Sequence, residues 1–106
     1  VPAASAAKVA AACFDAGAGQ VGQYAQCCWS VVGQGQFRPL SGSNPAIGAV
    51  DTVTKVEEVR VEMMCVKADW PKVERALLAA HPYETPAYYV LALFNPLRID
   101  DDSEGV

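Results

Sequence analysis

The sequence predicts a single α+β domain in which two helices pack on one face of an antiparallel sheet. Its 106 residues suit one domain, and stretches with helical and strand-like hydrophobic periodicity alternate along them. The predicted order is helix, strand, strand, helix, strand. One further strand at the front would complete the β-α-β-β-α-β order of ferredoxin-like folds. Right-handed crossovers bring both helices of that fold to the same face of the sheet.

Composition and charge exclude several classes of protein. The net charge is −4 and the chain has only eight Lys and Arg residues, which argues against a nucleic-acid partner. No apolar run approaches the roughly 18 residues of a membrane span. The four cysteines form no CxxC pair, so the usual zinc signature is absent. We interpret them as reduced thiols of a cytoplasmic protein.

The first predicted helix covers residues 3–16, with Ser5 as the N-cap and Gly17 as the C-terminal cap. The next six residues, 17–22, match the GxGxxG letters of a dinucleotide-binding loop. That fingerprint requires a strand before it and a helix after it, whereas here a helix precedes it. We therefore predict a glycine-rich turn from helix to strand.

Two strands and a loop follow the glycine-rich turn. A strand over residues 24–32 continues through Phe37, and residues 38–48 form a loop rich in Pro, Gly and Ser. A second strand over residues 53–67 alternates between two faces. One face carries Val59, Val61, Met63 and Cys65, and the other, wetter face carries Glu58, Arg60, Glu62 and Met64.

The second helix opens at Asp69-Trp-Pro71 and ends at His81-Pro82, because a residue before proline avoids the helical region. A turn over residues 83–86 leads to a last strand over residues 87–94. The predicted domain covers residues 1–97, and residues 98–106 form an acidic tail.

The first strand of the fold is largely missing from this chain. In the ferredoxin-like topology that strand is central, so a gap there would leave two ladders without partners. We expect either a strand upstream of Val1 or another segment in its place. Val1 and Pro2 would be its last two residues.

Three segments carry a resemblance to known families: residues 17–24, residues 33–39 with 44–48, and residues 80–84 with 86–87. Together they resemble the domain inserted in YqfO-type members of the Nif-three-like family, which also occurs alone as a short protein. The His81-Pro-Tyr-Glu84 segment is also similar to the CutA family, which has the related PII-like fold. The early end of the chain favours the stand-alone form.

The resemblance implies a CutA/PII-like domain that assembles as a homo-oligomer, a trimer or a larger ring. It does not imply an enzyme, because the metal centre of full-length Nif-three-like proteins lies in flanking domains. Thr85 and Tyr89 stand where the family motif has Glu and Asp, so two carboxylates are lost. That loss weakens a metal site carried over from the family.

The residues that could hold a ligand lie in the glycine-rich turns, the loop and the turn after the second helix. They are Tyr24, Phe37, Arg38, Glu62, His81, Tyr83 and Glu84. His81 is the single histidine, and it is a potential metal ligand or a residue that stabilises the helix end. Cys28, His81 and Glu84 are the residues that could hold a divalent metal, although their spacing forms no preformed chelate.

We therefore expect a non-enzymatic domain that binds a small ligand or has a regulatory role. The first alternative is copper or zinc binding in cation tolerance. The second is a module that docks on an unidentified protein partner.

Overall fold

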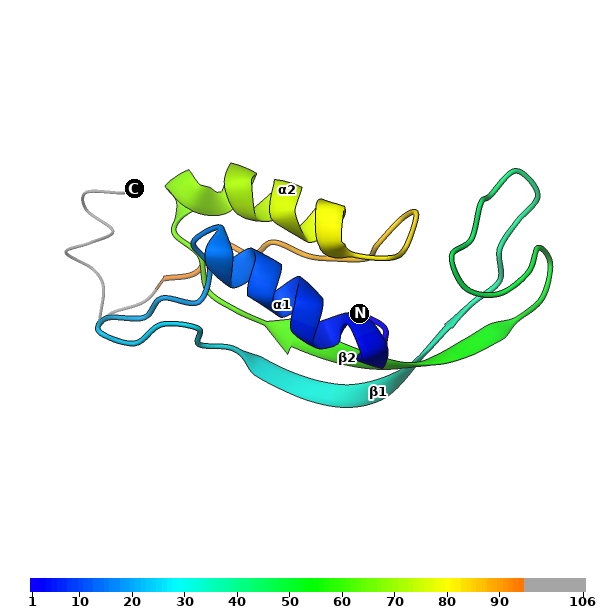
Figure 1. Cartoon of the computed structure of the whole chain (residues 1–106), viewed down its shortest axis with the longest axis horizontal. Coiled ribbons are helices and arrows are strands. Elements are labelled where there is room, and N and C mark those ends of the chain that lie inside the picture. The colour runs from blue at the N-terminus through cyan, green and yellow to red at the C-terminus, as the bar shows by residue number, and fades with distance from the viewer. Residues whose placement is uncertain (95–106) are drawn as a thin grey trace.

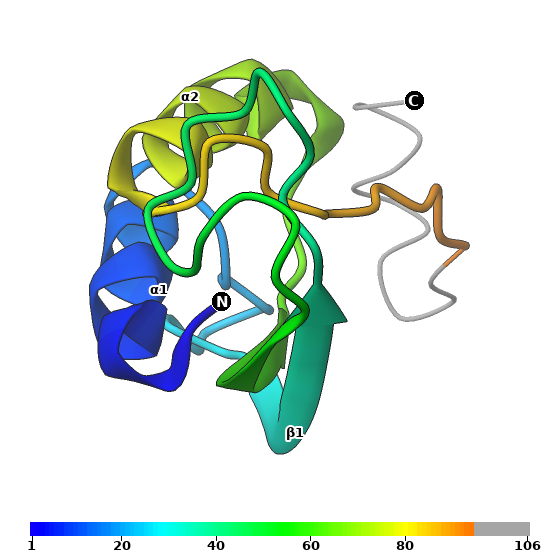
Figure 2. The ribbon, with the colours of Figure 1, turned by 90° about the vertical axis from the view of Figure 1, so that its right-hand side faces the viewer.

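The computed structural model describes residues 1–94, so the predicted tail over residues 98–106 lies outside the described part. The described chain runs through a 3-10 turn (Ala3–Ser5), α1 (Ala6–Asp15), β1 (Trp29–Phe37), β2 (Thr54–Glu62), a second 3-10 turn (Lys67–Asp69) and α2 (Trp70–Ala80). Both helices lie on one side of the hairpin formed by β1 and β2 (Figures 1 and 2). The predicted α+β class and helix placement are confirmed.

The strands pair antiparallel along their full length, from Trp29 opposite Glu62 to Phe37 opposite Thr54. This register places Glu58 opposite Gly33 and Val59 opposite Val32. Within residues 1–94 the sheet has these two strands. The predicted start of β1 at Tyr24 is wrong, because the chain before Trp29 makes a local bridge between Val21 and Tyr24 instead.

Helix α1 is rich in alanine, the best helix former, and buries Val9 and Cys13 one turn apart. It ends in a Schellman motif. The amide of Gly17 donates to the carbonyl of Phe14, and that of Ala18 donates to Cys13, both at 3.0 Å. Gly17 has φ +118°, as the predicted cap requires. Ser5 occupies the N-cap position but makes no side-chain cap bond.

The glycine-rich turn after α1 connects three parts of the chain. The amide of Gly19 donates to the carbonyl of Met64 at 2.7 Å, and its carbonyl accepts from the amide of Cys27 at 2.8 Å. Gly19 has φ +87°, a conformation that favours glycine. The helix before the turn and these bonds agree with the predicted structural role of the GxGxxG letters.

Helix α2 has Pro71 in its first turn and buries Val73, with Leu77 and Ala80 packed against the same core. His81 at its C-cap is extended, as predicted for a residue before proline. Within residues 1–94 the buried hydrophobic core is small and consists of Val9, Cys13, Ala18 and Val73. All four cysteines are free thiols.

Two predicted strand regions are wrong. The chain leaves β2 after Glu62 and turns into the 3-10 turn at Lys67, so Met63 and Cys65 pack on the helices from outside any strand. Residues 87–94 form no strand either, although they run back alongside α2 (Figure 1). A strand needs a hydrogen-bonded neighbour, and in the predicted topology their neighbour is the missing first strand.

Val1 and Pro2 lie where the end of that first strand was predicted. Pro2 forms an antiparallel bridge with Glu58, on the edge of β2 that β1 does not use. Val1 and Val59 also exchange two backbone hydrogen bonds, at 3.1 and 2.7 Å. The first two residues therefore extend the sheet by one short pairing.

Candidate functional site

Four of the predicted site residues meet at one end of the hairpin, around the turn after α2. The ring of Tyr83 packs edge-on against Phe37 of β1, with ring centroids 5.6 Å apart, and lies 5.0 Å from the ring of His81. Glu84 belongs to the same turn, and its carboxylate accepts the amide of Asn44 at 3.0 Å. This bond ties the turn to the loop that joins the strands.

A fifth residue, Glu58, completes this group. The hydroxyl of Tyr83 donates to a carboxylate oxygen of Glu58 at 2.7 Å. Glu58 lies on β2 beside Gly35 of β1, and a Cβ on Gly35 would overlap the carboxylate of Glu58. Glycine therefore leaves the room that the Glu58 side chain occupies. We call Phe37, Glu58, His81, Tyr83 and Glu84 the Tyr83 cluster.

Glu58 was not among the predicted site residues. The alternation of β2 places it on the wetter face and gives no sign of its contact with Tyr83. One signal could have found it, namely a cross-strand glycine next to a carboxylate in the middle of a hairpin.

His81 contacts Tyr83 through its ring and through its Nδ1 atom. Its Nδ1 accepts the amide of Tyr83 at 3.1 Å, so in the neutral ring the hydrogen is on Nε2. Burial lowers the pKa of His81 below its ordinary value of 6.5, and the positive amino group of Val1 lowers it further, while Glu58 acts in the opposite direction. Burial and the hydrogen bond to Glu58 raise the pKa of Tyr83. Both side chains are therefore neutral near pH 7.

The lowered pKa of His81 predicts a pH-dependent stability. The unfolded chain takes up this proton at a higher pH than the folded chain, so the free energy of unfolding falls as the pH drops below about 6.5. Protonation also removes the acceptor for the amide of Tyr83. Urea unfolding of the wild type and of His81→Gln at about pH 7.5 and about pH 5.5 measures the effect.

Because the chain has a single histidine, the variant should lose stability less steeply over this range than the wild type. Equal losses in the two proteins would contradict the assignment to His81. Glu84→Gln is the matched control, since it changes a neighbouring side chain and keeps the imidazole.

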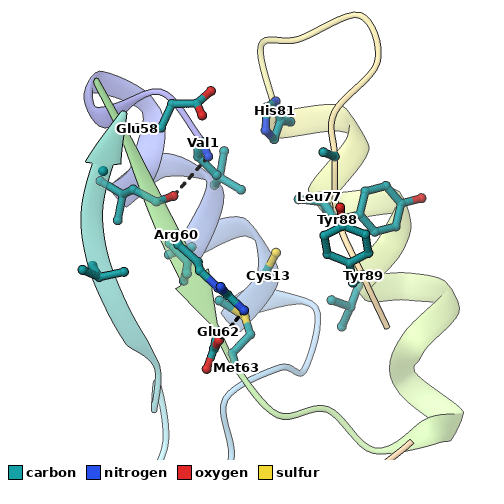
Figure 3. Close-up of a pocket in the computed structure, with 18 of the residues that line it drawn as sticks. Val1, Cys13, Glu58, Arg60, Glu62, Met63, Leu77, His81, Tyr88 and Tyr89 are labelled. Carbon is teal, nitrogen blue, oxygen red and sulfur yellow. Dashed lines mark hydrogen bonds and ion pairs between the residues drawn. The ribbon is translucent and has the colours of Figure 1, made fainter. Parts of the chain in front are cut away.

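A groove begins beside the cluster and runs along β2 (Figure 3). It encloses about 650 Å³, and Cys13, Leu77, Tyr88 and Val61 are among its lining residues. Glu58 and His81 line it at one end, near Val1. Glu62 and Met63 lie toward the other end, where Glu62 pairs with Arg60 at 3.1 Å. Glu62 is thus in the groove and not in the cluster.

The remaining predicted residues lie elsewhere. Arg38 is exposed directly after Phe37 at the end of β1. Tyr24 is 74% exposed in the segment before β1. Cys28 precedes Trp29, so the length of β1, roughly 30 Å, separates it from Phe37 at the far end of the strand. The structure does not bring Cys28 to His81 and Glu84.

Residues 1–94 contain no group of three or more His, Cys, Asp or Glu side chains placed to hold a metal ion. In the same residues, no helix is long and apolar enough to cross a membrane.

No family model matches the chain, whereas individual proteins and a solved structure do. The chain is 48% identical over 96 residues to a Mycobacterium tuberculosis protein named GTP cyclohydrolase 1 type 2 homolog, a match that covers 91% of this chain and 25% of that protein. A Bacillus subtilis protein of the same name is 43% identical over 81 residues, or 76% of this chain and 22% of that one.

Among solved structures, the chain is similar to a Bacillus cereus protein related to NIF3. The TM-score is 0.74 at 40% sequence identity, over 90% of this chain and 24% of that one. The chain therefore spans about a quarter of the length of the relatives it matches.

Proposed function

We infer the function of this chain from its homology to one segment of the Nif-three-like proteins, and we propose that it is a binding domain for a small polar molecule. The Tyr83 cluster is the proposed site. The observation that carries the proposal is that the Tyr83 hydroxyl donates to the carboxylate of Glu58, and that Glu58 and the neutral imidazole of His81 both line one end of an open groove. The proposal does not depend on the activity of the full-length relatives.

The cluster favours a neutral or cationic ligand with a planar ring. Glu58 and Glu84 are carboxylates, and their negative charges disfavour an anion. The Nε2–H of His81 is a donor for a carbonyl or hydroxyl oxygen, and the Glu58 carboxylate is an acceptor for an N–H or O–H group. The rings of Phe37 and Tyr83 offer an aromatic surface.

Nicotinamide and nicotinate are a suitable pair of probes, because they share one ring and differ in charge. In NMR titrations, millimolar nicotinamide should shift the His81 ring and Tyr83 amide signals saturably, and nicotinate should bind at least about fivefold more weakly. Tyr83→Phe and Glu58→Gln should each weaken nicotinamide binding about fivefold or more. Arg60→Gln, in the groove and outside the cluster, is the matched control.

Nicotinate binding as tightly as nicotinamide would contradict the charge argument. Shifts that survive Tyr83→Phe and Glu58→Gln would place binding outside the cluster. The absence of saturable shifts with either probe would oppose a ring-amide ligand.

We also propose that copies of the chain assemble into a homo-oligomer. Support comes from β1, an edge strand whose apolar side chains Trp29, Val31 and Val32 are 60%, 45% and 64% exposed. An edge strand with exposed apolar residues is suited to contact with another chain. The trimer or larger ring implied by the CutA resemblance remains part of this proposal.

A further inference from the structure

Cys13 and Cys65 lie in the same part of the core, although they are far apart in the sequence. Cys13 is 5% exposed on α1, and Cys65 packs against the core cluster to which Cys13 belongs. The Cys13 side chain points from α1 into the space between the helices and β2 (Figure 3). Both residues are free thiols. Two thiols from separate segments therefore share one packed region beneath α1.

Backbone hydrogen bonds hold the two segments together. The amide of Ala18 donates to the carbonyl of Cys13 at 3.0 Å, and the next amide, that of Gly19, donates to the carbonyl of Met64 at 2.7 Å. One peptide unit thus connects the backbone of Cys13 with the residue before Cys65. Because these bonds fix the chain on both sides, the two cysteines keep their relative position without a covalent link.

The acid–base properties of the two thiols agree with their proximity. Burial raises the pKa of Cys13 and of Cys65 above the ordinary value of 9.0. The negative charge of a Cys65 thiolate raises the pKa of Cys13 further, an effect that requires the two groups to be near each other. The carboxylate of Asp69 raises the pKa of Cys65 in the same way. Both thiols are therefore protonated near pH 7.

The other two cysteines differ from this pair. Cys28 is exposed, and the Cys27 thiol donates to the carbonyl of Ala25 at 3.8 Å. The amide of Cys27 donates to the carbonyl of Gly19 at 2.8 Å, so the backbone of Cys27 also lies near the segment that contains Cys65. Cys27 is therefore the rival partner that a test has to exclude.

We propose that Cys13 and Cys65 are a redox-sensitive pair that forms a reversible disulfide between α1 and the segment after β2. Cys65 is partly exposed and Cys13 is buried, so Cys65 is the residue that meets a small disulfide from solvent, such as oxidised glutathione. The bond would join two segments that only packing and hydrogen bonds now hold together. A disulfide also restricts the unfolded chain, so the oxidised form is the more stable one.

The reaction is two thiol–disulfide exchanges. The Cys65 thiolate attacks one sulfur of oxidised glutathione, the S–S bond of glutathione breaks, and one glutathione leaves as a thiolate. The Cys13 thiol then loses its proton to solvent and attacks the Cys65 sulfur of the mixed disulfide, which expels the second glutathione. The two protein thiols lose two electrons and two protons, and one oxidised glutathione takes them up as two thiols.

The cysteine pair is separate from the proposed ligand site. Glu58 of the Tyr83 cluster lies in the middle of β2, whereas Cys65 follows Glu62, the last residue of that strand. The inference therefore goes beyond the proposed function. Its test uses no ligand of the cluster, so the failure of one proposal leaves the other unaffected.

The test uses the double variant Cys27→Ser/Cys28→Ser, in which Cys13 and Cys65 are the two remaining cysteines. The folded chain, at low micromolar concentration, is incubated with millimolar oxidised glutathione at about pH 8, where more of each thiol is ionised. Intact mass, maleimide labelling in denaturant and thermal unfolding are then measured.

We expect the double variant to lose the mass of two hydrogen atoms, to retain no glutathione and to show no free thiol. Its midpoint of thermal unfolding should rise by at least about 5 °C, and dithiothreitol should reverse all of these changes. With Cys13→Ala added, Cys65 should keep one glutathione. With Cys65→Ala added instead, Cys13 should stay a free thiol because it is buried.

A glutathione adduct that persists while Cys13 stays a free thiol would mean that the two sulfurs are out of reach, and would overturn the proposal. Two unreacted thiols, or a disulfide between copies whose yield rises with concentration, would do the same. An intramolecular disulfide that survives Cys13→Ala in the otherwise wild-type chain would assign the bond to Cys27 instead. An oxidation rate that rises in Val73→Ala in step with its loss of stability would assign the reaction to the unfolded chain, and would also overturn the proposal.

Discussion

Replacing Gly19 by alanine is expected to lower the free energy of unfolding by about 3 kcal/mol. Gly19 has φ +87°, where any other residue is strained. Its new Cβ would lie 2.7 Å from the Phe14 ring and 3.0 Å from the carbonyl of Cys27. The ring would have to move, and the bonds that join Gly19 to Met64 and Cys27 would move with it.

Gly22→Ala is the matched control for this effect. Gly22 also has a positive φ, +56°, but nothing lies within 4 Å of the position that a Cβ would take. It should cost about 1–2 kcal/mol, which is the backbone term alone. Urea unfolding of both variants measures the difference, and similar losses in the two would contradict the steric part of the argument.

Val73→Ala is expected to cost about 2 kcal/mol, because it removes two methyl groups from the centre of the core and leaves a cavity. Val73 is 3% exposed and packs with Val9, Cys13 and Ala18, the other buried core residues of the described chain. Because few side chains form the buried core, a loss of about 2 kcal/mol is a large part of the free energy of unfolding of this domain.

Val32→Ala makes the same chemical change at a site on β1 that is 64% exposed. It should change the free energy of unfolding by less than about 0.5 kcal/mol. Equal losses for Val73→Ala and Val32→Ala in urea unfolding would mean that the core is not centred on Val73.

The helices could be predicted from the sequence because their ends carry local signals. Gly17 supplies the left-handed residue that ends α1, and Asp69-Trp-Pro71 and His81-Pro82 bound α2. These signals act within a few residues and do not depend on the rest of the fold.

The strand ends could not be predicted, because pairing decides them. Met63 and Cys65 continue the alternation of β2, yet the chain turns away after Glu62. Residues 87–94 have a strand-like sequence and no ladder. A periodic pattern marks which residues can be buried, whereas a strand also needs a neighbour that may lie far away in the sequence.

The candidate site also has a part that the sequence predicts and a part that depends on strand pairing. His81, Tyr83 and Glu84 belong to one turn, and the sequence singled them out together. Glu58 joins them only through the register of β1 and β2 and the space over Gly35. Register is a property of the paired strands, so one strand examined alone does not reveal it.

The two tryptophans differ in a way that gives the chain an optical reporter. Trp29 is 60% exposed on β1, while the ring of Trp70 lies 6.1 Å from that of Tyr88 and lines the groove. Indole fluorescence shifts with the polarity around the ring. In a Trp29→Phe background, emission from Trp70 alone would therefore report whether the groove beside it is filled by water or by apolar side chains.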